Sequence, residues 1–187
     1  MDKQPAKKTI MDKVEISRTI KRLAHELVEK NSGVEGIAII GVQTRGVSLG
    51  RRIIKEIIAA GLSEGKETIP FGLLDINLYR DDVAGMSMPP ALKETDIPFD
   101  VTGMNIVLID DVIFTGRSTR AALDQLMDFG RPKSIQLAVL IDRGNRELPI
   151  EPNFVGKKIS TSREEQVEVE LEEVDGQDRV LLKEAKE

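Results

Sequence analysis

Two adjacent acidic residues follow an apolar run in residues 106–118, IVLIDDVIFTGRS. Asp110 and Asp111 come directly after four apolar residues, a place where neighbouring carboxylates repel each other and gain nothing from burial. Carboxylates do accept hydrogen bonds from the vicinal hydroxyls of a sugar. The pair therefore predicts a bound ligand that carries hydroxyl groups.

The turn after the acids has the composition of a phosphate site. Thr115, Gly116, Arg117 and Ser118 lead into an expected helix at residues 118–129. A helix N-terminus carries about half a positive charge and unpaired N–H groups, so it attracts phosphate. A phosphate site beside a diol site predicts a ribose 5-phosphate. The plainer alternative is a buried strand with an N-capping Thr or Ser, which accounts for Ser118 but not for two consecutive acids.

The amino-acid composition limits the classes of protein to which the chain can belong. The chain has 187 residues, 40% hydrophobic and 32% charged, as in an ordinary globular protein. It has no cysteine, no apolar stretch near the ~20 residues of a membrane span and no signal-peptide core, so we expect a cytoplasmic protein with no membrane partner. P-loop and dinucleotide motifs are missing. The net charge of −5 argues against indiscriminate nucleic-acid binding but allows a local basic face.

Buried strands alternate with helices along the chain, which predicts an α/β fold with a mainly parallel sheet. We expect one domain, residues 1–187, with a flexible N-terminus at residues 1–11. A capping box at Asp12 and Glu15 begins the first helix. The other expected elements are strands at 33–42, 69–79, 104–110 and 134–142, helices at 47–61 and 118–129, a long loop at 80–100 and a C-terminal hairpin at 167–184.

Two polar segments follow expected strands of the parallel sheet. Residues 43–46 follow the strand at 33–42, and Asp110 and Asp111 follow the strand at 104–110. Ligands of open parallel sheets bind at the carboxyl ends of the strands. The two segments are therefore expected to meet at one site.

The pattern of an apolar run, Asp-Asp and Thr-Gly resembles the phosphoribosyl pyrophosphate (PRPP) signature of type I phosphoribosyltransferases. The segments GVQTRG, LDINLYRDD, LIDDVIFTGRSTRAALD, GRPKSIQLAVLIDRGNRELPI and VGKKISTS resemble, more narrowly, the family of bifunctional pyrimidine operon regulators and uracil phosphoribosyltransferases. The resemblance runs from about residue 16 to residue 180. It implies a central, mainly parallel sheet flanked by helices, with a small C-terminal β element.

The resemblance also implies roles for particular residues. Thr44, Arg45 and Gly46 would form the pyrophosphate loop, commonly with a non-proline cis peptide bond. Tyr79, Arg80, Asp81 and Asp82 would begin a loop that closes over the reactants, with Arg80 reaching the pyrophosphate. The ribose phosphate would lie against Asp110, Asp111, Val112, Ile113, Phe114, Thr115, Gly116, Arg117 and Ser118, and the uracil pocket would be bordered by Ile141, Asp142 and Arg143.

The implied reaction converts uracil and PRPP into UMP and pyrophosphate. Asp110, Asp111, Arg45 and Arg80 would be the catalytic residues, because they hold the ribose hydroxyls and the leaving pyrophosphate. Mg²⁺ would bind mainly through PRPP and water rather than through direct protein ligands.

The same family binds a pyrimidine-operon (pyr) messenger leader under the control of UMP or UTP, as a homodimer or tetramer. Candidate RNA contacts are Arg18, Lys21, Arg22 and His25 on the first helix, extended by Arg146, Lys157 and Arg163. Three departures from the family pattern are Gln43, Asn145 and Glu151. They leave open an enzyme without RNA regulation, favoured by Asn145 and Glu151, and a nucleotide-sensing RNA-binding module with little catalysis, favoured by Gln43.

Overall fold

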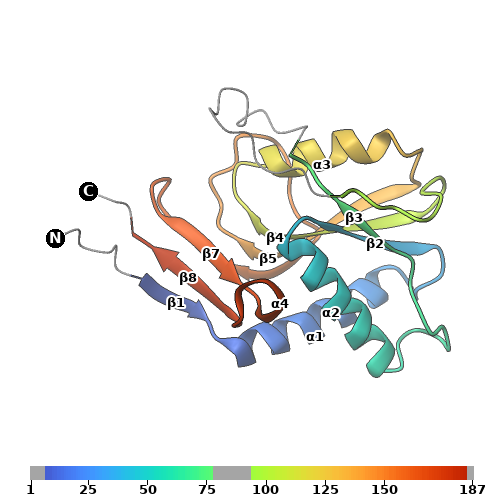
Figure 1. The fold of residues 1–187 in the computed structure, drawn as a ribbon, viewed down its shortest axis with the longest axis horizontal. Coiled ribbons are helices and arrows are strands. Elements are labelled where there is room, and N and C mark those ends of the chain that lie inside the picture. The colour runs from blue at the N-terminus through green and yellow to red at the C-terminus, as the bar shows by residue number, and fades with distance from the viewer. Residues whose placement is uncertain (1–6, 78–93, 185–187) are drawn as a thin grey trace.

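The computed structural model describes residues 7–77 and 94–184 of the chain. Its centre is a five-stranded parallel sheet with the strand order β3-β2-β4-β5-β6 (Figure 1). The strands are β2 (Ile37–Val42), β3 (Phe71–Leu74), β4 (Asn105–Ile113), β5 (Ser134–Asp142) and β6 (Phe154–Lys158). The predicted α/β fold with a mainly parallel sheet is confirmed.

Helices cover both faces of this sheet. Helices α1 (Lys13–Lys30) and α2 (Arg45–Ala59) lie on one face, and α3 (Arg117–Met127) lies on the other (Figure 1). Successive residues of a strand point to opposite faces. Ile39 accordingly packs in the core under α1 and α2, and Ile40 packs in the core under α3. Burial on both faces explains the continuous apolar runs in the sequence.

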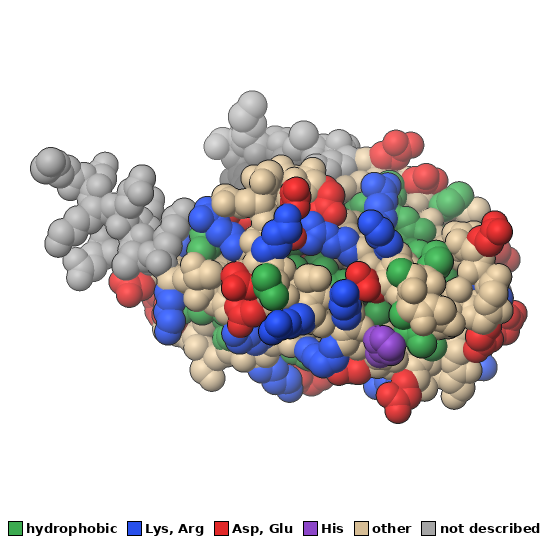
Figure 2. Space-filling view, turned by 90° about the horizontal axis from the view of Figure 1, so that it is seen from below, with side chains coloured by type: hydrophobic (Ala, Val, Ile, Leu, Met, Phe, Trp, Pro, Cys, Tyr) green, Lys and Arg blue, Asp and Glu red, His purple; other side chains and the backbone are tan. Residues whose placement is uncertain are grey.

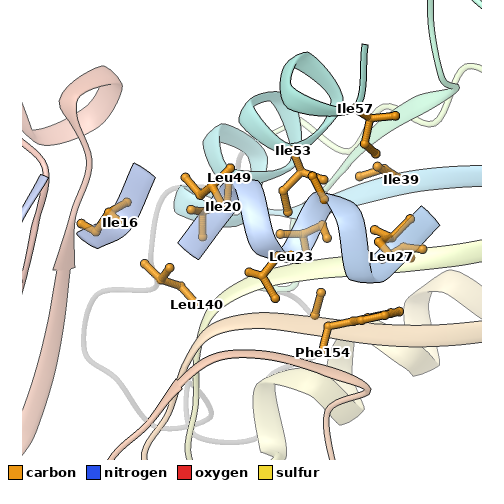
Figure 3. Packing of buried hydrophobic residues seen from close by; sticks show 14 of the residues in the cluster. Ile16, Ile20, Leu23, Leu27, Ile39, Leu49, Ile53, Ile57, Leu140 and Phe154 are labelled. Atoms are coloured by element: carbon orange, nitrogen blue, oxygen red, sulfur yellow. The ribbon is translucent and has the colours of Figure 1, made fainter. Parts of the chain in front are cut away.

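Helix α1 forms where its capping residues and apolar spacing predict. The side chain of Asp12 accepts a hydrogen bond from the Glu15 backbone N–H, and the side chain of Glu15 accepts one from the Asp12 N–H, which completes the capping box. An apolar stripe at helical spacing then faces α2 and the sheet (Figure 3). Each large aliphatic side chain buried there contributes about 1.5–3 kcal/mol. The stripe consists of Ile16, Ile20, Leu23 and Leu27.

A second, smaller sheet stands beside the first and contains β1 (Lys7–Met11), β8 (Arg179–Lys183) and β7 (Gln166–Glu170) in that order. All of its pairings are antiparallel. The expected C-terminal hairpin is confirmed, with a short helix, α4 (Glu172–Asp175), in its turn. The expectation of a flexible N-terminus is wrong for residues 7–11, since these residues pair with β8 and Met11 is buried in the core.

Some element boundaries differ from the sequence expectations. Helix α2 begins at Arg45 rather than at residue 47, and β4 continues past the acidic pair to Ile113 because it keeps its pairing with β5. Strand β6 was not expected, since its five residues show no clear alternation. Most of the expected loop at 80–100 lies outside the described residues. No helix within the described ranges is long and apolar enough to cross a membrane.

Candidate functional site

The two polar segments singled out in the sequence lie on neighbouring strand ends. Strands β2 and β4 pair directly, with Gly41 opposite Ile109. At Gly46 a β-carbon would lie 2.3 Å from the Ile109 carbonyl oxygen and 3.3 Å from the Asp110 Cα. Only a glycine allows this approach, which brings the start of α2 against the end of β4. The expectation that the segments meet is confirmed.

The acidic pair is held by its own backbone. One oxygen of Asp110 accepts a hydrogen bond from the Asp111 N–H at 2.9 Å, and one oxygen of Asp111 accepts from the Val112 N–H at 2.9 Å. Both residues are half-buried. Burial raises the pKa of Asp111, while its hydrogen bond with Asp110 and the nearby charge of Arg45 act in the opposite direction. The pair is thus a fixed group of hydrogen-bond acceptors at this end of β4.

The turn after β4 ends in a left-handed glycine. Gly116 has φ +92° and caps α3, which begins at Arg117. The Thr115 hydroxyl accepts a hydrogen bond from the Arg117 N–H at 3.3 Å, and the Thr115 carbonyl accepts from the Glu147 and Leu148 N–H groups at 2.9 and 3.1 Å. These bonds fix the turn, and the first N–H groups of an 11-residue helix lie next to it. This arrangement suits an anion such as phosphate.

Arg45 is the first residue of α2 and follows a cis peptide bond between Gln43 and Thr44, as the resemblance implies. Its guanidinium makes a two-point ion pair with Asp175 of α4, with Nε–Oδ2 at 3.0 Å and Nη2–Oδ1 at 2.8 Å. The hydrogen bonds to Asp175 raise the pKa of Arg45. Asp175 was not predicted from the sequence, because no local motif links it to Arg45.

The end of β5 forms the third side of the site. The Arg143 guanidinium lies over the Phe114 ring, 3.9 Å from its centroid, and donates to the Thr161 hydroxyl at 3.0 Å and the Ser162 carbonyl at 2.8 Å. Arg143 is buried, and burial lowers its pKa. The Asp142 side chain accepts from the Gly144 N–H. The residues expected at the base pocket thus lie against the turn that follows β4.

A second residue that the sequence did not place here is Arg146. Its Nε donates to the Ile150 carbonyl at 2.9 Å, its Nη1 to the Phe114 carbonyl at 3.1 Å, and its Nη2 pairs with Asp142 at 2.8 Å. These bonds connect the loop after β5 to the turn after β4, and the Arg146 side chain is only 14% exposed. Glu151 lies 3.6 Å from the same Nη2.

The candidate RNA-binding residues differ in their surroundings. Arg18, Lys21 and His25 are exposed on α1. Arg22 is bonded to Glu26 and to the backbone of β6, and Lys157 donates to the Ile10 carbonyl. Figure 2 shows the face on which α1 lies, with Lys and Arg side chains spread across it between acidic ones. Arg163 pairs with Glu147 beside the turn after β4.

Two further expectations concern the rest of the site. Tyr79, Arg80, Asp81 and Asp82 lie outside the described residues. Within the described ranges, no three carboxylate or histidine side chains gather as a metal site. A groove of about 400 Å³ lies elsewhere, between α1, α2 and α4, and is lined by paired charges such as Arg52, Glu173 and Asp178. Because these charges neutralise each other, we place the functional site at the strand ends.

Comparison with known proteins agrees with this geometry. Residues 7–174 match the family described as a phosphoribosyl transferase domain. A solved hypoxanthine phosphoribosyltransferase from Staphylococcus aureus has the same fold, with a TM-score of 0.66 at 17% identity over 96% of this chain and 92% of that chain. Fold and match together define a phosphoribosyltransferase.

Relatives with higher sequence identity show which family of phosphoribosyltransferases the chain resembles. Bifunctional protein PyrR of Thermus aquaticus is 55% identical over 176 residues, covering 94% of this chain and 95% of that protein. Bifunctional protein PyrR of Pelotomaculum thermopropionicum is 50% identical over 184 residues, covering 97% and 98%. The chain belongs to the PyrR family of phosphoribosyltransferases.

Proposed function

We propose that the chain transfers the phosphoribosyl group of PRPP to uracil and regulates pyrimidine genes by UMP-dependent binding to the pyr messenger leader. The proposed enzymatic activity rests on the close approach of Gly46 to the backbone of Ile109 and Asp110. This contact joins a diol-binding acid pair, a phosphate-binding turn and an arginine in one place.

In this proposal the protein acts by positioning and by charge. The turn at residues 115–118 holds the 5′-phosphate, and Asp110 and Asp111 accept hydrogen bonds from the ribose hydroxyls. The bond from ribose C1 to pyrophosphate breaks, and positive charge builds on the ring, where the two carboxylates stabilise it. Uracil N1 then bonds to C1 and gives its proton to water or to the departing pyrophosphate, whose negative charge Arg45 and Arg80 neutralise.

The donor set fits Mg²⁺, because carboxylates, sugar hydroxyls and pyrophosphate all offer the oxygen ligands that this ion prefers. When bound, the ion neutralises part of the pyrophosphate charge. Asp110 and Asp111 are the residues that would orient the hydroxyls of a magnesium-bound PRPP.

UMP formation tests the enzyme. The purified chain is incubated with PRPP, Mg²⁺ and uracil, and in parallel with hypoxanthine and with guanine. We expect UMP from uracil and no nucleotide from either purine. Purine nucleotides without UMP would point to a different base, and no product from any base would leave only the RNA-binding role.

RNA regulation rests on the exposed basic residues Arg18, Lys21 and His25 of α1 and on membership of the PyrR family. A filter-binding titration of the pyr leader RNA, with and without UMP, tests it. We expect tighter binding with UMP, because a ligand shifts an equilibrium only by binding one state better. Equal affinity in both titrations would refute nucleotide sensing.

We further propose a cytoplasmic homodimer or homotetramer, with UMP and UTP as the competing effectors. Two copies would double the basic surface that a folded RNA loop meets. Sedimentation equilibrium measures the mass directly, and a monomer at micromolar concentration would contradict the assembly.

A further inference from the structure

The strands β7 and β8 and the helix α4 between them form a C-terminal β unit, residues 166–183. One carboxylate of this unit contacts a residue of the site. Asp175 lies in α4, between β7 and β8, and pairs with Arg45 at the start of α2, 130 residues away in sequence. Figure 1 shows α4 beside this end of α2. Both side chains are partly shielded, with exposed fractions of 31% for Arg45 and 20% for Asp175. A two-point pair of this kind fixes the plane of the guanidinium as well as its position.

Asp175 is itself held rigidly. Its Oδ2 also accepts a hydrogen bond from the Leu171 N–H at 2.9 Å. Leu171 and Val180, on either side of α4, are fully buried in the core that α1 and α2 share with the sheet. The carboxylate is therefore anchored to the body of the protein rather than to a free loop.

The pair leaves Arg45 able to meet an anion. It occupies Nε and Nη2, and among the described residues no hydrogen-bond partner lies against Nη1. The charges of Arg45 and Asp111 are close enough to act on each other's pKa. Without Asp175, attraction would draw the flexible side chain of Arg45 towards Asp111 and cover the carboxylate that the ribose needs.

We propose that Asp175 is a positioning residue for phosphoribosyl transfer, which holds the Arg45 guanidinium away from Asp111 and ready for the pyrophosphate of PRPP. This inference rests on the proposed function and deepens it. It assigns the C-terminal β unit a part in substrate binding. It also gives a role to the ion pairs that join α2 to the turn between β7 and β8.

Asp175→Asn tests the inference, because the amide keeps the shape and the acceptor for Leu171 but loses the charge. Asp178→Asn is the matched control, since Asp178 lies near the same turn and makes a two-point pair with Arg52, which is not part of the site. For Asp175→Asn we expect the KM for PRPP to rise about tenfold, with kcat and the KM for uracil within about twofold of the original values. Asp178→Asn should leave all three unchanged.

A double variant separates positioning from a general loss of stability. In an Arg45→Ala background, Asp175→Asn should no longer change kcat/KM for PRPP, since its partner is gone. An equal effect in both backgrounds, or equal effects of Asp175→Asn and Asp178→Asn, would overturn the inference. If Asp175→Asn does not fold, Asp175→Ser, which also removes the charge, gives the same readout: a raised KM for PRPP supports the inference and an unchanged one overturns it. An original chain that makes no UMP refutes the proposed function instead.

Discussion

The acid pair of β4 gives the site its charge at the scale of single residues. Asp110 and Asp111 are consecutive residues in the C-terminal half of β4, and one oxygen of each already accepts a hydrogen bond from a backbone N–H. The arrangement keeps both carboxylates in place before any ligand arrives. In the proposed reaction, such preorganisation would lower the free-energy cost of stabilising a positive ribose ring in the transition state.

Asp111→Asn removes one of these charges without changing the size of the side chain. We expect kcat for UMP formation to fall about 100-fold, because a fixed charge next to the developing positive charge is lost. The melting temperature should not fall, since burial raises the pKa of Asp111 and a neutral amide avoids that cost. Steady-state kinetics and thermal unfolding measure the two effects, and an unchanged kcat would refute the assigned role.

Gly46→Ala tests the contact that joins the two halves of the site. A β-carbon would lie 2.3 Å from the Ile109 carbonyl oxygen, so α2 must move away from β4. We expect a loss of about 2–3 kcal/mol in the free energy of unfolding, together with a raised KM for PRPP. Urea unfolding provides the measurement.

The control is Gly61→Ala, which has the same chemical change at a left-handed residue with no atom within 4 Å of the added carbon. It should cost about 1 kcal/mol through backbone strain alone and leave the KM for PRPP unaltered. Equal kinetic effects of the two variants would show that the contact at Gly46 does not align the site.

The C-terminal β unit is bound to the rest of the molecule by ion pairs at the scale of elements. Arg52 of α2 pairs with Glu173 and Asp178 around α4, and Arg45 pairs with Asp175. The hydrogen bond from Arg52 lowers the pKa of Glu173. Burial acts to raise the pKa of Asp178, but hydrogen bonds from Arg52 and the Glu172 N–H outweigh it, and the net shift is downward.

These lowered pKa values predict a pH dependence of stability. A carboxylate with a lowered pKa in the folded state stabilises the fold fully above its unfolded pKa, near 4, and the stabilisation is lost as the pH falls through the folded value. Arg52→Gln removes the cause for Glu173 and Asp178. The difference in melting temperature between the original chain and Arg52→Gln should be constant above about pH 5 and shrink below about pH 4. A difference that stays constant to about pH 3 would contradict the assigned ion pairs.

The elements that the sequence predicted well are those whose signals are local. The capping box at Asp12 and Glu15 begins α1, and strand β5 has the boundaries of its apolar run. Strand β1 was missed because its stability comes from pairing with β8 at the far end of the chain. Asp175 was missed for the same reason, since only the tertiary fold brings it to Arg45. Local patterns thus located the turn that we propose binds phosphate, and long-range contacts determined what supports it.

The distribution of charge matters more than its sum at the scale of the whole molecule. The net charge is −5. Several basic side chains near α4 form ion pairs with acidic residues, as Lys13 does with Glu172. Arg18 and Lys21 on α1 make no ion pair with the described residues and remain available to phosphates. An acidic protein that presents Arg18 and Lys21 on α1 would bind RNA through this face and repel it elsewhere.

Lys21→Ala tests this surface through the salt dependence of RNA binding. Each phosphate contact releases counterions, so losing one should reduce the slope of log K against log salt concentration by about 0.7–0.9. The matched control is Lys133→Ala, an equal change of charge at an exposed residue just before β5, at the opposite end of the sheet from the strand ends of the site. Lys133→Ala should leave the slope unchanged, and both variants should keep the original rate of UMP formation. Equal slopes for the two variants would show that RNA responds to the overall charge of the molecule, and α1 would then not be the RNA-binding face.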